Sequence, residues 1–309
     1  MAIHSKQKAY LALTATSIIW GTTWVAMKFG IKGIPAFELA AIRQFIAASI
    51  FIGFFLIKKE PLPTKAQFKK LLLLGVLAFV MANALSTYSL KYISSGLGAL
   101  IGALYPLSVV IIEYFFFKNK TINFTTIVGI LLGIVGIAFV FYDNAFGAHP
   151  TGYLLGLTLA IIAMLSWSLS SILIARKYVE LNPYFGMGWQ MLFSSFIVGI
   201  ISFSTEKTIP ISNISFEAWM AVAYLIAAGS IIAIVAFVYS LKYLNPSIAV
   251  LYAYINPIVA MITGTIFLKE KLNATIIIGS LITISGVFLV NYSMRKMRRK
   301  LEISIASES

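Results

Sequence analysis

Few side chains in this 309-residue chain could support acid–base, nucleophilic or metal chemistry. The chain has no cysteine, which excludes disulfides, thiol nucleophiles and thiolate metal ligands. Its two histidines, His4 and His149, fall in polar segments far apart in the sequence. No aspartate, glutamate or histidine lies near the middle of an apolar stretch, where a buried proton relay would need one. We therefore expect no enzymatic activity, no metal and no cofactor, because the usual nucleophile–base pairs cannot be assembled.

Two prolines at corresponding places in the two halves are the first candidates for a ligand site. Pro106 and Pro257 each lie about 12 residues into an apolar stretch. Proline removes a backbone hydrogen bond from a helix and frees a carbonyl of the preceding turn. Matched helix interruptions of this kind point to the central binding site of a transporter. We expect both prolines to line a cavity together with Tyr105, Tyr252 and Asn256, and a packing kink without a ligand is the alternative.

Three tryptophans lie deep inside apolar stretches. Trp20 and Trp24 are four residues apart and therefore share one helix face, and Trp167 has nearly the corresponding place in the second half. Trp189 and Trp219 lie near the ends of their stretches, which is typical of the interfacial aromatic belt. The three deeper tryptophans could form aromatic walls for an apolar or aromatic solute, or they could simply pack against neighbouring helices.

One cation and several neutral polar residues are embedded in the apolar stretches. Arg43 lies about seven residues, roughly 10 Å, inside its predicted helix. A charge at that depth is costly and marks a candidate functional site. It could pair with a substrate carboxylate, or it could bind helix carbonyls. Gln190 lies near the position of Arg43 in the second half, and Asn83 belongs to a polar stretch that also contains Ser86 and Thr87.

Membrane-spanning helices must position these residues. The chain is 60% hydrophobic and 11% charged, with a mean hydropathy of +0.93, whereas soluble domains carry about 25% charged residues. A helix needs about 20 mostly apolar residues to cross the hydrocarbon core, and it satisfies its backbone groups internally. We predict an all-α integral membrane protein with ten transmembrane helices at 9–29, 36–57, 71–90, 94–117, 121–142, 151–175, 184–203, 218–241, 245–268 and 272–292.

Lysine and arginine are distributed unevenly among the segments that connect these helices. With a cytoplasmic N-terminus, 17 of the 24 basic residues lie in inner segments, six lie in outer segments, and Arg43 lies within a span. Basic residues in short connections favour the cytoplasmic side. The net charge of +14 is therefore read as a topology signal and not as a nucleic-acid-binding signal. We predict that both termini are cytoplasmic.

The two halves of the chain resemble one another in sequence. The pentapeptide YSLKY occurs in both, and aligning 88–120 with 239–271 gives 11 identities in 33 positions. Omitting one residue extends the match to 122–142 and 272–292, with nine identities in 21 positions. Each half holds five predicted helices, an odd number, so the second half would enter the membrane inverted relative to the first.

This repeat gives the predicted organisation of the chain. We expect a first five-helix repeat over 1–147, an inverted second repeat over 148–292 and a basic tail over 293–309. The fifth predicted helix of each repeat carries small residues about four apart, which favour close helix packing. These residues are Gly129, Gly133, Gly136, Gly279, Thr283 and Gly286.

Several motifs follow one another over nearly the whole chain. W-G-x-x-W runs from Trp20 to Trp24, and P-x-x-x-x-x-x-x-R runs from Pro35 to Arg43. The motifs S-L-K-Y, P and K-x-K follow one another in the first half and again, in the same order, in the second half. In the first half G-x-x-x-G comes next. In this order and spacing the chain resembles the EamA family of the drug/metabolite transporter superfamily. The resemblance implies a transporter of amino acids or related metabolites, often outward, with helices 1–4 and 6–9 around a cavity and helices 5 and 10 at the periphery.

One position departs from that family pattern. The family usually carries an acidic residue where the fourth helix of a repeat ends. Glu270 is that residue in the second repeat, whereas Asn119 stands at the matching position in the first. A mechanism that needs both acids is therefore not expected.

The predicted function is secondary transport of a small organic metabolite, with amino-acid export favoured, by alternating access between the inverted repeats. A lipid-carrier flippase of the same superfamily is the alternative, and no nucleotide motor is expected because the chain lacks a P-loop motif. The expected partners are a small-molecule substrate and the lipid bilayer, with no nucleic acid, and the expected location is a bacterial inner membrane. Glu38 and Glu113 lie toward helix ends, so we expect facilitated diffusion or weak coupling to an ion gradient.

Overall fold

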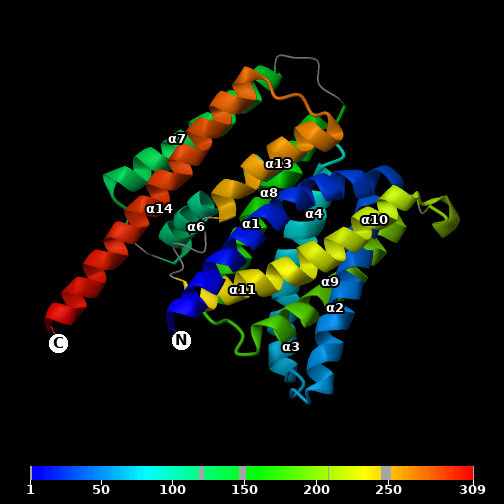
Figure 1. The fold of residues 1–309 in the computed structure, drawn as a ribbon, viewed down its shortest axis with the longest axis horizontal. Coiled ribbons are helices and arrows are strands. Elements are labelled where there is room, and N and C mark those ends of the chain that lie inside the picture. The colour runs from blue at the N-terminus through cyan, green and yellow to red at the C-terminus, as the bar shows by residue number, and fades with distance from the viewer. Residues whose placement is uncertain (1, 118–121, 146–150, 208, 245–251, 309) are drawn as a thin grey trace.

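The computed structural model describes residues 2–117, 122–145, 151–207, 209–244 and 252–308, and its secondary structure there is entirely helical (Figure 1). The first half contains α1 (Ala2–Gly33), α2 (Ala36–Ile57), α3 (Lys65–Gly75), η1 (Val76–Ala84), α4 (Leu85–Ser89), α5 (Ser95–Gly102), α6 (Tyr105–Phe116) and α7 (Phe124–Ala145). The second half contains α8 (Tyr153–Ala175), α9 (Pro183–Thr205), η2 (Ile211–Asn213), α10 (Phe216–Tyr224), η3 (Leu225–Ile232), α11 (Ala233–Tyr243), α13 (Tyr252–Leu268) and α14 (Ala274–Glu308).

The all-α prediction is confirmed, and helices cover most of the described part of every predicted span, with the span 94–117 divided into α5 and α6. Within the described residues, seven helical stretches are long and apolar enough to cross a membrane, and α13 and 124–140 are shorter apolar helices. The number of helices that cross the membrane and the side on which the termini lie stay predictions. The boundary proposed between the repeats, the matching position Asn119 and His149 fall outside the described residues.

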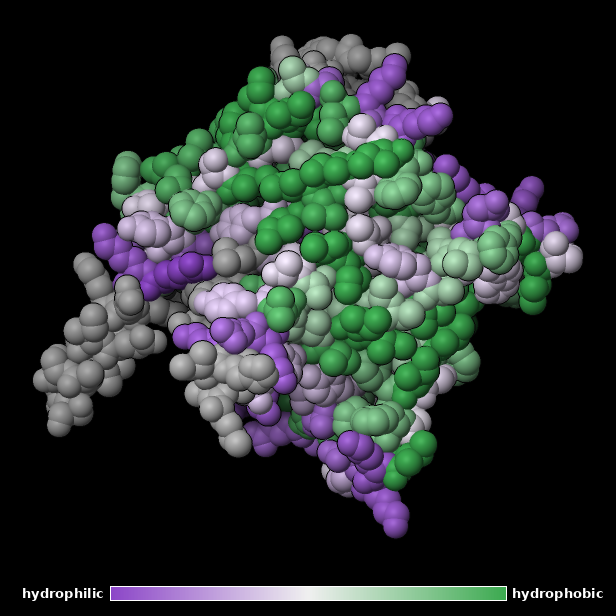
Figure 2. Space-filling view, in the orientation of Figure 1, coloured by the Kyte–Doolittle hydropathy of each residue, from purple (hydrophilic) through white to green (hydrophobic). Residues whose placement is uncertain are grey.

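The surface agrees with a membrane environment. Hydrophobic side chains cover most of the face shown in Figure 2, and hydrophilic ones gather toward its margins. Large apolar side chains are extensively exposed on the helices, among them Phe124, Phe203 and Phe216. Soluble monomers rarely expose contiguous apolar patches on this scale, because such surface is unfavourable in water.

The third helical stretch of each half, 65–89 and 216–243, is not a continuous α-helix but contains a π-helical segment. In the first half η1 connects α3 to α4, and in the second half η3 connects α10 to α11. A π-helix bonds residue i to i+5, is wider than an α-helix and often occurs at functional sites. The apolar composition that predicts these spans cannot distinguish the two helix types. The paired π segments are therefore a finding of the structure.

The fifth helices of the two halves pack against each other at one edge of the molecule, where α7 and α14 run side by side (Figure 1). A Cβ added at Gly129 would lie 2.7 Å from the carbonyl oxygen of Gly286. A Cβ added at Gly279 would lie 2.8 Å from the carbonyl oxygen of Gly136. The predicted packing role of these glycines is confirmed, because side chains there would push the two backbones apart.

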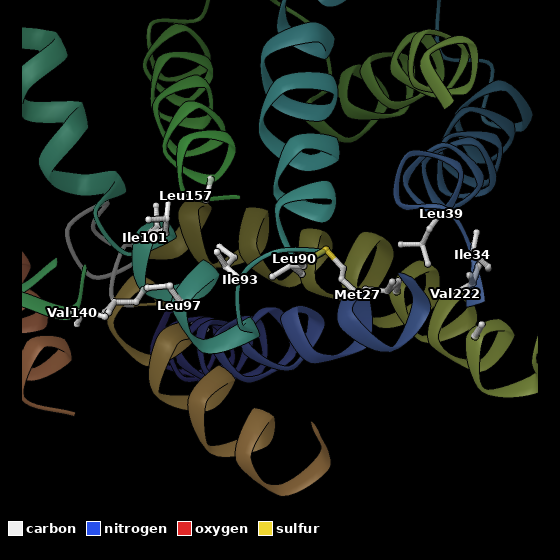
Figure 3. Close-up of a cluster of buried hydrophobic side chains, with 14 of the residues drawn as sticks. Met27, Ile34, Leu39, Leu90, Ile93, Leu97, Ile101, Val140, Leu157 and Val222 are labelled. Atoms are coloured by element: carbon white, nitrogen blue, oxygen red, sulfur yellow. The ribbon is translucent and has the colours of Figure 1, made fainter. Parts of the chain in front are cut away.

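The largest cluster of buried apolar side chains lies at one end of the bundle. It joins α1, α2 and the link between α4 and α5 to α5, α8 and α10. Figure 3 shows Met27 and Leu90 close together, with Leu97 and Leu39 on either side and Val222 beyond. This apolar cluster draws residues from both halves and therefore closes that end of the interface between them.

Candidate functional site

A central cavity of about 210 Å³ lies between the two halves. Its described walls come from α1, α2, η1, α4, α5, α6, α8, α9, η3, α11 and α13, and α7 and α14 contribute none of its described lining residues. This agrees with the arrangement that the family resemblance implies. Eight of the eleven predicted site residues line this cavity: Trp20, Trp24, Arg43, Asn83, Tyr105, Trp167, Tyr252 and Asn256.

Four aromatic rings form one wall, which we call the aromatic wall. Trp20 lies with its ring centroid 5.1 Å from Phe237 and 5.0 Å from Tyr252. Phe237 and Tyr252 are 5.3 Å apart, and Tyr105 stacks on Tyr252 at 6.5 Å. The rings come from α1, α11, α13 and α6, so both halves build the wall. Tilted and edge-to-face pairs at these separations are favourable ring contacts and hold the rings in fixed orientations.

Two glycines of α5 make room for Trp24. A Cβ added at Gly98 would lie 2.8 Å from Cζ3 of this tryptophan, and one added at Gly102 would lie 3.4 Å from Cζ2. The indole therefore lies close against the α5 backbone while also lining the cavity. The spacing of Trp20 and Trp24 predicts a shared face, and the structure brings both side chains to the same cavity.

Arg43 is the only charged side chain among the described residues that line the cavity. It is 8% exposed, and its Nε has no hydrogen-bond partner among the described residues. Burying an unpaired guanidinium is strongly unfavourable, so an arginine with free donors favours an anionic ligand. The alternative role, in which Arg43 binds a helix carbonyl, has no support at Nε, because this atom contacts no described acceptor.

Gln44, next to Arg43, was missed by the sequence analysis. It is 1% exposed, and its Nε2 donates to the carbonyl oxygen of Phe79 at 3.2 Å and to Oδ1 of Asn83 at 3.3 Å. Phe79 and Asn83 belong to η1 and line the cavity. Trp20 has the equivalent relation to the second π segment, because its Nε1 donates to the carbonyl oxygen of Gly229 in η3 at 3.2 Å. Each π segment thus accepts a side-chain hydrogen bond beside the cavity.

A second buried polar atom without a partner belongs to a residue of the cavity wall. Oδ1 of Asn256 has no hydrogen-bond partner among the described residues, and the residue lines the cavity on α13. An amide oxygen accepts hydrogen bonds, whereas a guanidinium only donates them. The cavity wall therefore includes a residue with hydrogen-bond donors, Arg43, and a residue with an acceptor, Asn256, and these two groups together suit a zwitterionic or hydroxyl-bearing carboxylate.

The two predicted prolines are buried but do not belong to the cavity lining. Pro106 follows an interruption between α5 and α6, as expected, whereas Pro257 lies inside the continuous helix α13. Each proline deprives the residue four positions earlier of its hydrogen-bond donor. Those residues are Gly102 and Ala253, and both line the cavity. The prolines thus act on the wall through the preceding turn and not through their own rings.

Gln190 is also absent from the central cavity. It is 5% exposed and lines a second cavity of about 490 Å³, at the end of the bundle where α3 and α9 begin and α8 ends. Its Oε1 has no hydrogen-bond partner among the described residues. Met187 lines both cavities, so the second cavity lies next to the central one.

The predicted interfacial role of Trp189 is not what the structure favours. Its ring packs against Phe68, Phe185 and Phe193 at centroid distances of 4.9, 6.0 and 6.0 Å. Its Nε1 is buried without a hydrogen-bond partner among the described residues. A belt tryptophan normally directs this group toward the polar interface, so Trp189 is primarily a packing residue.

The wall also contains methionines that the sequence analysis did not single out. Met27, Met164, Met187 and Met191 line the central cavity. Flexible thioether side chains fill irregular spaces and adapt to different ligands. In a chain that is 60% hydrophobic, no local pattern distinguishes these methionines from ordinary core residues.

Comparisons with known proteins agree with this architecture. The model of the EamA-like transporter family matches residues 7–142 and again 154–292. The chain is 29% identical over 257 residues to "Uncharacterized inner membrane transporter YedA" of Escherichia coli K12, covering 82% of this chain and 81% of that protein. It is 24% identical over 294 residues to "Uncharacterized transporter YoaV" of Bacillus subtilis 168, covering 94% and 99%. A crystal structure with 16% identity and a TM-score of 0.65 covers 94% of this chain and 99% of its own, and it shows the shared fold alone.

Proposed function

Because the chain belongs to the EamA-like transporter family, we propose that it is a secondary transporter that moves a small organic metabolite across a bacterial inner membrane. The favoured substrates are amino acids and related carboxylates, and the favoured direction is export. Alternating access between the two inverted repeats would carry the substrate across. The bacterial location rests on the E. coli relative, which is named as an inner membrane transporter.

Arg43 is the observation that carries this proposal. A guanidinium buried beside an aromatic wall, with no partner at Nε, is unfavourable in the empty cavity and favourable once a carboxylate binds. Asn256 supplies an acceptor for a hydroxyl or ammonium group. The aromatic wall would then contact the apolar part of the solute.

The size of the cavity favours a small solute over the lipid-carrier alternative. Sites for drug-sized ligands occupy about 300–1,000 Å³, and the central cavity is about 210 Å³. A flippase would need a lateral opening that holds a headgroup while its chains stay in the lipid. We therefore keep the flippase only as an outcome of the experiment below.

A thermal-shift screen of the purified protein against metabolites tests the proposal. We expect an amino acid or related carboxylate to raise the melting temperature, and Arg43→Ala to abolish that rise. Gln44→Leu is unsuitable as a control because Gln44 contacts η1. Gly53→Ala is suitable, because no atom lies within 4 Å of a Cβ added at Gly53. A screen in which only lipid-linked compounds shift the melting temperature would favour the flippase instead.

Flux measurements in proteoliposomes then address transport and its energy source. We propose facilitated diffusion or weak gradient coupling, because no acidic side chain is among the described residues that line the cavity. Uptake of the identified solute should proceed without an imposed pH gradient. Strict dependence on the gradient, lost in a Glu113→Gln variant, would contradict this energy source.

A further inference from the structure

Glu206 connects the second repeat to the first at the start of α2. It follows the C-terminus of α9, and the backbone N–H groups of Ala36 and Phe37 donate to its Oε1 at 3.0 Å and its Oε2 at 2.9 Å. Ser202 Oγ donates to Oε2 at 3.0 Å, and the Glu206 side chain is 6% exposed. The first N–H groups of a helix lack intrahelical partners and carry the positive end of the helix dipole. A buried carboxylate there is therefore a charge-assisted cap.

Glu270 makes the same kind of connection at the start of α5. Backbone N–H groups of Ser95 and Gly96 donate to its carboxylate at 2.8 and 3.3 Å, and Ser95 Oγ donates at 2.8 Å. Just before it, Lys269 has φ 56°, so the chain turns sharply where α13 has ended. A Cβ added at Gly264 would lie 2.6 Å from Oε2 of Glu270. Glycine at 264 therefore leaves the space that the carboxylate occupies.

The two carboxylates are joined by the link between α4 and α5. Lys91 in this link lies 3.9 Å from Oε1 of Glu206, and Ser95 at the end of the link donates to Glu270. Lys28 of α1 donates to the carbonyl oxygens of Leu90 and Ile93 in the same link. The apolar cluster of Figure 3 includes Leu90 and Ile93. At this end, polar contacts between the repeats thus lie next to the apolar cluster.

The opposite end is joined differently. There the N-terminus of α9 is capped within its own half by Asn182, and that of α3 by Thr64. Around the second cavity, the described polar side-chain contacts between the halves include an Arg176–Glu113 ion pair at 3.6 Å, with side chains 46% and 25% exposed, and an exposed Gln67–Glu180 hydrogen bond. Away from the cavities, at the same end, Ser293 of α14 bonds to Thr126 and Asn123 at the start of α7 at 2.8 and 2.7 Å. Exposed ion pairs contribute little stability. The second cavity lies at this end, so the structure is closed at one end and hollow at the other.

We propose that Glu206 and Glu270 form a latch that holds one end of the transporter closed, and that both carboxylates must leave α2 and α5 before the cavity can open toward that end. The latch regulates access to the central cavity and therefore rests on the proposed transport function. Both contacts cross between the repeats, so rocking of one repeat against the other breaks them together. By the predicted topology this end is the outer one.

Cysteine accessibility measures the state of the latch directly, because the parent chain has no cysteine to give background labelling. Ser86→Cys places a nearly isosteric thiol in the cavity wall. A membrane-impermeant maleimide is applied separately to each side of oriented vesicles, and the side of Glu206 is fixed by labelling Glu217→Cys, an exposed site in the first turn of α10 at the same end. The parent Ser86→Cys protein should react slowly from the latch side and faster from the other.

Glu206→Gln/Glu270→Gln in the Ser86→Cys protein should raise the labelling rate from the latch side by about tenfold or more, since each charge-assisted cap is lost, and lower it from the other side. Glu217→Ala, which removes an exposed carboxylate at the same end, should change neither rate. If the double variant does not elute as a folded protein in size-exclusion chromatography, the same labelling experiment is done with Glu206→Gln and Glu270→Gln separately.

Unchanged labelling from the latch side in a folded double variant would overturn the proposal. The labelling needs no substrate. A change in accessibility therefore supports the latch even when the metabolite screen finds no binder. A confirmed binder combined with unchanged accessibility would refute the latch and leave the transport proposal intact.

Discussion

The indole Nε1 of Trp20 donates to the carbonyl oxygen of Gly229 at 3.2 Å, which ties the first helix of one repeat to the π-helical segment of the other. Both residues line the central cavity, and the Trp20 ring also belongs to the aromatic wall. A single side chain thus fixes a wall of the cavity and the spacing between the repeats. Its hydrogen bond and its ring contacts can be separated by mutation.

Trp20→Phe keeps an aromatic ring and removes the hydrogen bond, so we expect a loss of about 1 kcal/mol in stability. Trp20→Ala also removes the ring and should cost about 3–5 kcal/mol. Melting temperatures of the two variants in detergent test this order. Equal losses would mean that ring packing against Phe237 and Tyr252 adds nothing beyond the hydrogen bond.

Arg43→Met should stabilise the empty protein while abolishing binding of a carboxylate ligand. The substitution replaces a buried guanidinium that has no partner at Nε with an apolar side chain. Burying even a neutral polar group without a hydrogen bond costs about 1–3 kcal/mol in proteins, and burying a charge costs more. We therefore expect a higher melting temperature without ligand and no ligand-induced rise. A lower melting temperature for Arg43→Met would show that the arginine has a structural partner.

Arg43→Lys is the matched control for that experiment. Lysine keeps the positive charge but lacks the planar donors of arginine. If the ligand carboxylate is bound by two donors, Arg43→Lys should weaken binding strongly and leave some residual affinity. Full affinity in this variant would indicate that charge alone is needed.

The sequence predicts the gross arrangement well because its signals are regional. Apolar length, the distribution of basic residues and the internal repeat each average over many positions, so the all-α fold was predictable, and small residues four apart predicted close packing for α7 and α14. That these two helices pack against each other is a finding of the structure. Trp20 and Arg43 were also found, because each is unusual for its depth in an apolar stretch, and Tyr252 and Asn256 were found because they neighbour Pro257.

What the sequence did not predict depends on contacts between distant segments. Gln44 is adjacent to Arg43, and its role depends on a hydrogen bond to the carbonyl oxygen of Phe79. Phe79 belongs to a π-helix, which no apolar pattern in the sequence reveals. Gln190 lies near the position of Arg43 in the repeat, yet its side chain lines the second cavity. Glu206 follows the end of a helix, and from the sequence alone it resembles an ordinary surface acid. Its contact with the first backbone N–H groups of α2 is visible only in the structure. Repeat symmetry predicts positions but not side-chain directions.

Gly98→Ala tests whether Trp24 is held by the α5 backbone. The added Cβ would lie 2.8 Å from Cζ3 of Trp24, so the indole must move into the cavity. Overpacking of this kind costs about 1–3 kcal/mol, and the affinity for the ligand should fall because the cavity becomes smaller. Gly53→Ala is the control, since its Cβ meets no atom within 4 Å. Equal melting temperatures and affinities for Gly98→Ala and the parent protein would contradict the contact.

Gly264→Ala tests the latch without replacing either glutamate. Its Cβ would lie 2.6 Å from Oε2 of Glu270 and 2.7 Å from Oγ of Ser95, so the carboxylate must move away from the start of α5. The helix itself tolerates alanine, which has a higher helix propensity than glycine by about 1 kcal/mol. In the Ser86→Cys protein we therefore expect faster maleimide labelling from the latch side. Adding Glu270→Ala should then change the rate little further, because both substitutions break the same contact. Fully additive rates would mean that Gly264 acts on the cavity by another route.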